Sequence, residues 1–431
     1  MDTKKELKIF AWIAGFFLAA WFMPVGTPRF DNAVLEAFEL VRWYAHEHVL
    51  LCLIPAFFIA GVISVFVSQA SVIKYFGANA VKWKSYLIAS VSGTILAVCS
   101  CTILPLFSSI HKRGAGLGPA IAFLYSGPAI NILAIILTAR ILGFELGVAR
   151  IIGAVVFSIV IGLLMAFFFR KEEREKAAAQ LNVPDVEDGR PLWQTSLHFF
   201  ALVAVLVFAN WGQPGADTGL FSLIFQYKWP LVGIFAIVVG FTLVRMMGMK
   251  PTHVVLAALP VAALAIVFPD QPLYAFVAGT AALTILTAMY PGEPREWLAS
   301  TWDFTKQIMP LLGAGVLVAG LLLGTAGGEG LIPNEWVSAL VGGNSLAANL
   351  FASVFGAFMY FATLTEVPIV QGLLASGMGK GPALALLLAG PALSLPNMLV
   401  IRSVMGTKKT LVFIVLVVIM ATISGMLYGS M

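Results

Sequence analysis

The sequence is poor in charged residues. Asp, Glu, Lys and Arg make up 11% of its 431 residues, and 60% of the residues are hydrophobic. A soluble domain carries about 25% charged residues, so this composition excludes an ordinary soluble domain and indicates a protein that lies in a lipid bilayer. Up to thirteen stretches contain none of the four charged residue types, and most approach the ~20 residues that a spanning helix needs. We therefore expect an all-α polytopic membrane protein with about 10–13 membrane segments.

Cysteines are also scarce. The three in the chain, Cys52, Cys99 and Cys101, cannot form a secreted disulfide framework. The sequence shows no nucleotide-binding loop, zinc signature or nucleophile elbow, which argues against an ATP-driven pump and predicts a protein that is not an enzyme and has no metal or cofactor. The net charge of +5 requires no nucleic acid, because basic residues near membrane surfaces account for it.

The N-terminus carries lysines followed by an apolar run. Lys4, Lys5 and Lys8 precede this run, as in a signal peptide, but no small-x-small cleavage site follows it. We therefore expect a first membrane helix within residues 1–44. Basic residues on the two sides of the membrane nearly balance, so the orientation of the chain stays open.

The chain matches itself at an offset of 263 residues. GPAIAFLYSGPA at 118–129 corresponds to GPALALLLAGPA at 381–392, and 89–129 shares 16 of 41 positions with 352–392. The shared glycines and prolines carry the most weight because they fix backbone shape. They include Pro105 with Pro368, and Gly114, Gly116 and Gly118 with Gly377, Gly379 and Gly381.

This match predicts two related helical bundles. Residues 45–170 form repeat 1 and residues 300–431 form repeat 2, with a charged loop at 171–190 and further membrane segments at 191–299. Duplicated bundles with interrupted helices are typical of secondary transporters. Whether the repeats are parallel or inverted depends on how many middle segments cross the membrane, so both arrangements stay open.

Prolines predict breaks in these bundles. Pro105 removes the partner of the Cys101 carbonyl, so we expect the chain to bend or unwind at the cysteines, and Pro368 should do the same at Leu364. In extended backbone, residues two apart point the same way. Cys99 and Cys101 would then face one cavity; on a regular helix they would not.

A second pair of breaks is expected at two Gly-Pro sequences. Ser126, Gly127 and Pro128 interrupt one helix, and Ala389, Gly390 and Pro391 interrupt its counterpart. Unpaired backbone cannot face lipid, so such breaks are buried in protein or line a wet cavity. Polar side chains follow them, and we expect a substrate path there; the alternative is a pair of kinks that serve packing. These side chains are Asn131, Ser394 and Asn397.

Glu366 is the strongest candidate for an ionisable group within the membrane. It follows a run of 30 uncharged residues, and 13 uncharged residues come after it. Such a group is costly at depth and usually marks an ion or substrate path, which suits a proton carrier. The alternative is that a helix ends at Glu366 and places its carboxylate at the membrane interface.

The paired cysteines suit a soft ligand. Thiolates bind soft metals and metalloids, so Cys99 and Cys101 could hold a thiophilic centre or cycle through a disulfide. The alternative is that they fill space as small apolar residues, which is the reading we favour for Cys52.

The segment CSCTILPLFSSIHKRGAGLGPAIAFLYSGPAINILAI at 99–135 resembles the predicted-permease family that contains the organoarsenical efflux permease ArsP and YraQ-like proteins. AGPALSLPNML at 389–399 also fits this family. The resemblance implies a multi-spanning permease of a prokaryotic inner membrane. For the ArsP branch it implies export of trivalent organoarsenicals, with Cys99 and Cys101 as arsenic ligands.

We therefore expect a secondary-active permease that exports a thiophilic small molecule and is coupled to protons through Glu366. A permease for a metal ion or a sulfur compound is one alternative, and a membrane thiol–disulfide oxidoreductase is another. The oligomeric state stays open, a homo-oligomer included.

Overall fold

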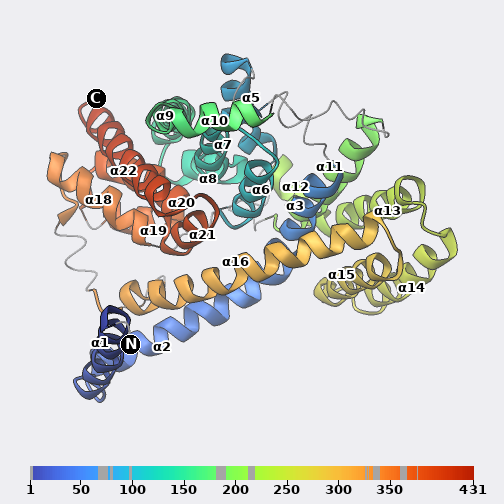
Figure 1. The fold of residues 1–431 in the computed structure, drawn as a ribbon, viewed down its shortest axis with the longest axis horizontal. Coiled ribbons are helices and arrows are strands. Elements are labelled where there is room, and N and C mark those ends of the chain that lie inside the picture. Colours follow the sequence, from blue (N-terminus) through green and yellow to red (C-terminus); the bar gives the residue numbers. More distant parts are fainter. Residues whose placement is uncertain are drawn as a thin grey trace.

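The computed structural model describes residues 3–66, 76–77, 81–96, 100–180, 191–211, 219–325, 328, 330–332, 340–359, 366–375 and 377–431. Within these ranges the protein is helical, and the only extended pairing is an isolated bridge between Gly342 and Met378. The predicted all-α membrane class is thus confirmed (Figure 1). The helices are α1 (Thr3–Trp21), α2 (Pro28–Tyr44), the π-helix η1 (Ala45–Leu53), α3 (Ile54–Phe66), α5 (Lys82–Leu96), α6 (Ser100–Lys112), α7 (Leu117–Ala129), α8 (Ile132–Ile141), α9 (Phe144–Phe168), α10 (Arg170–Gln180), α11 (Leu192–Ala209), α12 (Leu220–Gln226), α13 (Lys228–Met247), α14 (Pro251–Val267), α15 (Pro272–Met289), α16 (Glu293–Leu323), α18 (Leu346–Phe358), α19 (Glu366–Ala375), α20 (Lys380–Leu393), α21 (Leu395–Met405) and α22 (Thr407–Gly429).

Two long helices run antiparallel through the molecule. One is the continuous 39-residue helix α2–η1–α3, and the other is the 31-residue helix α16 (Figure 1). Gly320, near the end of α16, lies against Ala37 near the start of α2. Gly61, near the end of α3, lies against Trp297 near the start of α16. A glycine at each crossing lets the two backbones approach closely.

The helices that follow each long helix form two series, α5–α9 and α18–α22. Their bounds keep the offset found in the sequence: α20 begins 263 residues after α7, α21 the same distance after α8, and α22 the same distance after α9. The packing is also alike, because α5 contacts α7 and α7 contacts α9 just as α18 contacts α20 and α20 contacts α22. The long helices that precede the two series run antiparallel to each other.

A matched glycine contact holds each series together. A Cβ placed on Gly162 of α9 would lie 2.6 Å from the Gly118 carbonyl oxygen of α7, and a Cβ on Gly425 would lie 2.6 Å from the Gly381 carbonyl oxygen. These four glycines occupy equivalent positions at the 263-residue offset. No larger residue fits at these crossings without moving a backbone.

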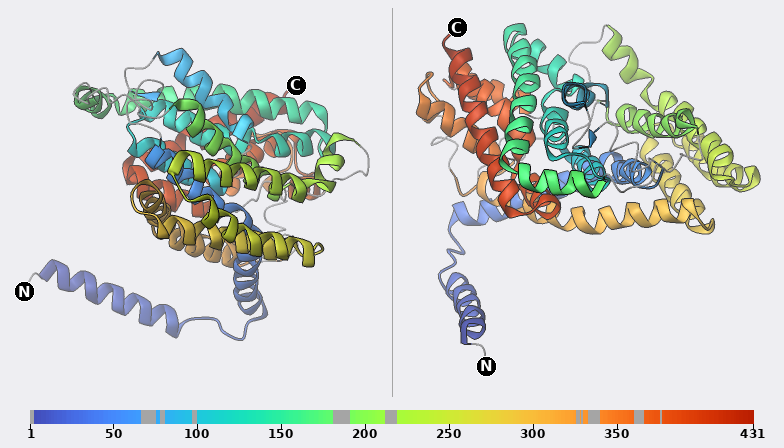
Figure 2. Two further views of the ribbon diagram at one scale, coloured as in Figure 1. Left: turned by 90° about the vertical axis from the view of Figure 1, so that its right-hand side faces the viewer. Right: turned by 45° about the horizontal axis from the view of Figure 1, so that its top comes forward.

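The middle helices α11–α15 lie at the end of the molecule farthest from α18–α22, and α1 projects away from the bundle (Figures 1 and 2). Within the described ranges six helices are long and apolar enough to cross a membrane, or seven if the bent pair α20–α21 is one span. The 10–13 segments expected include apolar stretches that form shorter helices, such as α14 and α18. The expected N-terminal span forms helix α1, but its first turns carry Lys4, Lys5, Glu6 and Lys8, and α1 is not among the six.

Candidate functional site

Both series contain an interrupted helix. In the first, α7 ends at Ala129 and α8 begins at Ile132; in the second, α20 ends at Leu393 and α21 begins at Leu395 after a bend of 47°. The interruptions expected at Ser126–Pro128 and Ala389–Pro391 therefore lie two to three residues later. Pro128 and Pro391 each stay inside a helix because the residues after them still donate backward, Ile130 to Ser126 and Ser394 to Gly390.

The first break is held by Arg150, which projects from α9. Its Nε donates to the Ala129 carbonyl oxygen at 2.9 Å, and its Nη1 donates to the Thr138 hydroxyl on α8 at 2.9 Å. Thr138 in turn donates to the Ala134 carbonyl oxygen at 2.6 Å. The last carbonyls of a helix lack helical partners and favour a nearby cation, so the guanidinium stabilises the end of α7.

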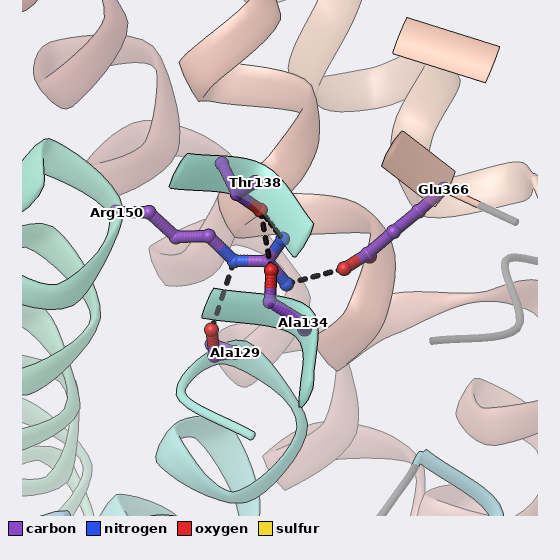
Figure 3. A network of polar contacts seen from close by, with 5 residues as sticks. All are labelled: Ala129, Ala134, Thr138, Arg150 and Glu366. Carbon is purple, nitrogen blue, oxygen red and sulfur yellow. Dashed lines mark hydrogen bonds and ion pairs between the residues drawn. The ribbon is translucent and has the colours of Figure 1, made fainter. Parts of the chain in front are cut away.

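Glu366 completes this network from the second series. Its Oε1 lies 2.5 Å from Arg150 Nη2, and the side chains of Glu366 and Arg150 are 1% and 0% exposed (Figure 3). Glu366 is the first residue of α19, where a carboxylate is favoured by the positive end of the helix. The carboxylate is thus shielded from solvent by the protein. It is buried and paired, and it ties α19 to α8 and α9.

The positions equivalent to Glu366 and Arg150, again one in each series, are apolar. At the 263-residue offset Ile103 corresponds to Glu366, and Phe413 corresponds to Arg150. Ile103 is 1% exposed and Phe413 is fully buried. One pair of positions, divided between the two series, thus carries an ion pair, and the equivalent pair carries two buried apolar residues.

The second break leaves polar groups without partners. Ser394 occupies the N-cap position of α21, but its side chain makes no capping hydrogen bond. Among the residues that the structure describes, the buried Ser394 Oγ and Asn397 Oδ1 have no hydrogen-bond partner. Burying such groups unpaired is costly, so they are suited to bind an external ligand. Helix α21 packs against α6, which carries Cys101, and against α16.

The remaining predicted site residues fall into three groups. Gly127, Pro128, Gly390 and Pro391 are buried within α7 and α20. Ser126 donates to the Ala89 carbonyl oxygen of α5 at 3.1 Å and thus joins two helices of one series. Asn131 is 2% exposed and follows the end of α7, near the Ala129 carbonyl that Arg150 binds.

The cysteine predictions are only partly covered. Cys99 lies outside the described residues, as do Ala362 and Leu364, which align with the two cysteines. Cys101 is in the first turn of α6, which runs without interruption past Pro105. The expected extended backbone at Cys101 is therefore wrong. Pro105 is the sixth residue of α6, and the helix continues past it. Pro368 is the third residue of α19, where a helix needs no proline N–H.

Sequence reasoning missed Arg150 altogether. It follows Arg140 and Glu145 in the sequence, and such a cluster resembles an interfacial loop. The one sequence signal is the position of Arg150 within the helical segment. It is the seventh residue of the 25-residue helix α9 and therefore lies well inside that helix. His198 is a further buried polar residue; it lies in α11, where it contacts Thr242 and Trp297.

Comparison with known proteins identifies the group to which these features belong. The family model described as "Predicted permease" matches residues 34–430, nearly the whole chain. The chain belongs to this predicted-permease family. The permease is 41% identical over 386 residues to the UPF0718 protein MJ0584 of Methanocaldococcus jannaschii, which covers 90% of this chain and 93% of the relative.

More distant relatives are bacterial. The permease is 20% identical to the UPF0718 protein YraQ of Escherichia coli over 78% of this chain and 63% of YraQ. It is 24% identical to the UPF0718 protein YcgR of Bacillus subtilis over 27% of this chain and 39% of that protein. No solved structure matches the permease. The interrupted helices α7–α8 and α20–α21 are thus elements of a multi-pass membrane permease.

Proposed function

We propose that the protein is a secondary-active permease in which α2–α9 and α16–α22 are inverted repeats. The observation that carries this proposal is the pair of breaks at equivalent places, each with buried polar groups beside it. Transporters of this plan bind substrate where discontinuous helices leave backbone groups free. The substrate would bind between the two breaks, and rocking of the repeats would expose it to each side in turn.

The cargo that best fits the sequence is a thiophilic small molecule such as a trivalent organoarsenical. Cys99 and Cys101 would bind its soft centre, and Glu366 would bind the coupling proton. Ser394 Oγ and Asn397 Oδ1 would accept hydrogen bonds from hydroxyl groups of the cargo, because neither atom has a partner among the described residues. The family's archaeal and bacterial members support a place in a prokaryotic inner membrane. A metal ion or a sulfur compound is the alternative cargo.

The test measures arsenic accumulation in cells that lack their own arsenic exporters. The cells would express the wild type, the double variant Cys99→Ser with Cys101→Ser, or the double variant Ser394→Ala with Asn397→Ala, and be exposed to methylarsenite. We expect less arsenic in wild-type cells than in cells with empty vector, and loss of this difference in both double variants at equal expression. The matched control is Ser430→Ala, because Ser430 is exposed at the C-terminus.

Two results would contradict the proposal. Equal arsenic content in cells with wild type and with empty vector would exclude arsenicals as cargo. Efflux by the cysteine double variant at the wild-type rate would exclude the thiols as ligands and leave them as packing residues.

A further inference from the structure

We infer that Arg150 and Glu366 form a proton-operated latch between the two repeats. A proton from water binds the Glu366 carboxylate, the ion pair with the Arg150 guanidinium is lost, and α19 is released from α8 and α9. When the proton leaves, the carboxylate pairs with Arg150 again. This inference deepens the proposed function, because it names the residue through which the coupling proton acts.

The ion pair connects the first break to the second series, so it can control the proposed motion between the repeats. Arg150 donates hydrogen bonds to the last carbonyl of α7 and to the Thr138 hydroxyl of α8, so it connects the two helices on either side of the first break. Its third contact, Glu366, belongs to the second series. Movement of α19 relative to the first break must therefore separate Glu366 from Arg150 or move both together (Figure 3).

The electrostatic surroundings leave Arg150 as the partner of Glu366. Helix α19 packs against α8 and α20, and Arg150 reaches it from α9. The other charged residues of these elements lie exposed near the helix ends; they are Arg140 on α8, Glu145 on α9 and Lys380 on α20. Protonation of Glu366 thus removes a charge that, in the part of the chain the structure describes, only Arg150 balances directly. A buried guanidinium without a counter-charge costs free energy. The states with Glu366 ionised and with Glu366 protonated therefore favour different contacts of α19.

The fold itself does not require an ion pair at this place. At the equivalent positions Ile103 on α6 and Phe413 on α22 are buried and apolar. A buried ion pair is often no more stabilising than a well-packed apolar pair of similar size. An ion pair confined to one of two equivalent positions therefore points to a role beyond packing, and a group that gains and loses a proton supplies that role.

The test requires no knowledge of the cargo. The purified full-length protein, reconstituted in lipid nanodiscs, is titrated from pH 9 to pH 5 while infrared difference spectra record the carbonyl stretch of protonated carboxyl groups. Hydrogen–deuterium exchange, corrected for the intrinsic effect of pH, follows residues 366–375 and 132–141 in the same samples. In the wild type we expect one carboxyl band to grow as the pH falls, together with faster exchange in both segments.

Three variants decide the outcome. Glu366→Gln should lack the band and exchange quickly in both segments at every pH. Arg150→Met should keep the band up to a higher pH than wild type, because a buried carboxylate without its cation takes up a proton more readily. The control Asp303→Asn should leave the band unchanged, since Asp303 is exposed and pairs with Lys306.

The latch is refuted if Glu366→Gln retains the wild-type band, because Glu366 would then not titrate. It is also refuted if the band titrates while exchange in α19 stays constant, because the pair would then not hold the helix. Failure of methylarsenite transport leaves both measurements intact, so the two proposals fail separately. If the latch fails while arsenical efflux persists, the coupling proton binds elsewhere.

Discussion

Replacing the Arg150–Glu366 ion pair by the apolar residues at the equivalent positions tests what the pair contributes to stability. The variants are Glu366→Ile, Arg150→Phe and the double variant, which copy Ile103 and Phe413. Breaking a buried pair by removing one partner costs about 3–5 kcal/mol, whereas replacing both partners by apolar groups is often neutral or stabilising by about 1–4 kcal/mol.

The contacts of Arg150 refine this expectation. Arg150→Phe also removes the donor to the Ala129 carbonyl oxygen, and an orphaned buried acceptor costs about 1–3 kcal/mol. Thr138 keeps its bond to Ala134 and adds little. The double variant should therefore lie within about 2 kcal/mol of wild type. The two single variants together should cost at least about 6 kcal/mol, which leaves a coupling of at least about 4 kcal/mol.

The measurement is equilibrium unfolding of the purified protein in mixed micelles, read as a double-mutant cycle. The same cycle at the exposed pair Asp303–Lys306, 2.8 Å apart, is the control and should give a coupling below about 1 kcal/mol. A coupling at Arg150–Glu366 as small as at this surface pair would refute the reasoning. So would a double variant as unstable as the sum of the single variants.

Three further predictions concern the helices around the breaks. Gly162→Ala and Gly425→Ala should each lower stability by about 1–3 kcal/mol, because the new Cβ would meet a carbonyl oxygen of the neighbouring helix. The control Gly313→Ala should not lower stability, because the space around Gly313 is open. Thermal unfolding in micelles compares the three variants. Glu173→Ala should destabilise the start of α7 by about 1 kcal/mol, because the Glu173 carboxylate accepts a hydrogen bond from the Leu117 N–H at 2.8 Å. Hydrogen exchange at residues 117–121 should be faster in this variant than in the control Glu175→Ala, whose side chain is exposed in the wild type. Thr138→Val should remove one hydrogen bond that positions the Arg150 guanidinium. If the latch operates, the infrared titration of Glu366 should then shift to higher pH. An unchanged titration would show that Thr138 does not position the guanidinium.

The parts of the fold that could be predicted from the sequence depend on backbone shape. Matching glycines and prolines reveal the offset of 263 residues, because a glycine at a helix crossing or a proline near a break constrains the backbone wherever it occurs. The position of each break was predicted only to within a few residues. A proline removes one hydrogen bond, but the residues after it can still donate backward and complete the last turn, as Ile130 and Ser394 do.

The electrostatic centre of the site could be predicted only in part. Glu366 is conspicuous because it stands alone in a long uncharged stretch, whereas Arg150 lies close to two other charged residues in the sequence. These two partners are 216 residues apart and meet because α9 and α19 belong to different series. No local pattern encodes such a meeting. The polar groups without partners at Ser394 and Asn397 are likewise visible only once neighbouring helices have been placed.

The antiparallel long helices also determine how the protein meets a bilayer. A helix of 39 residues is about 58 Å long, roughly twice the thickness of the hydrocarbon core, so α2–η1–α3 must tilt steeply or extend into water. The charged residues of each long helix lie in its first half, among them Glu36 and Glu39 in α2 and Asp303 and Lys306 in α16. Because the helices run in opposite directions, the polar half of each lies beside the apolar half of the other. The two ends of the pair are therefore alike in composition, which suits the proposed carrier, because it must open to each face of the membrane in turn.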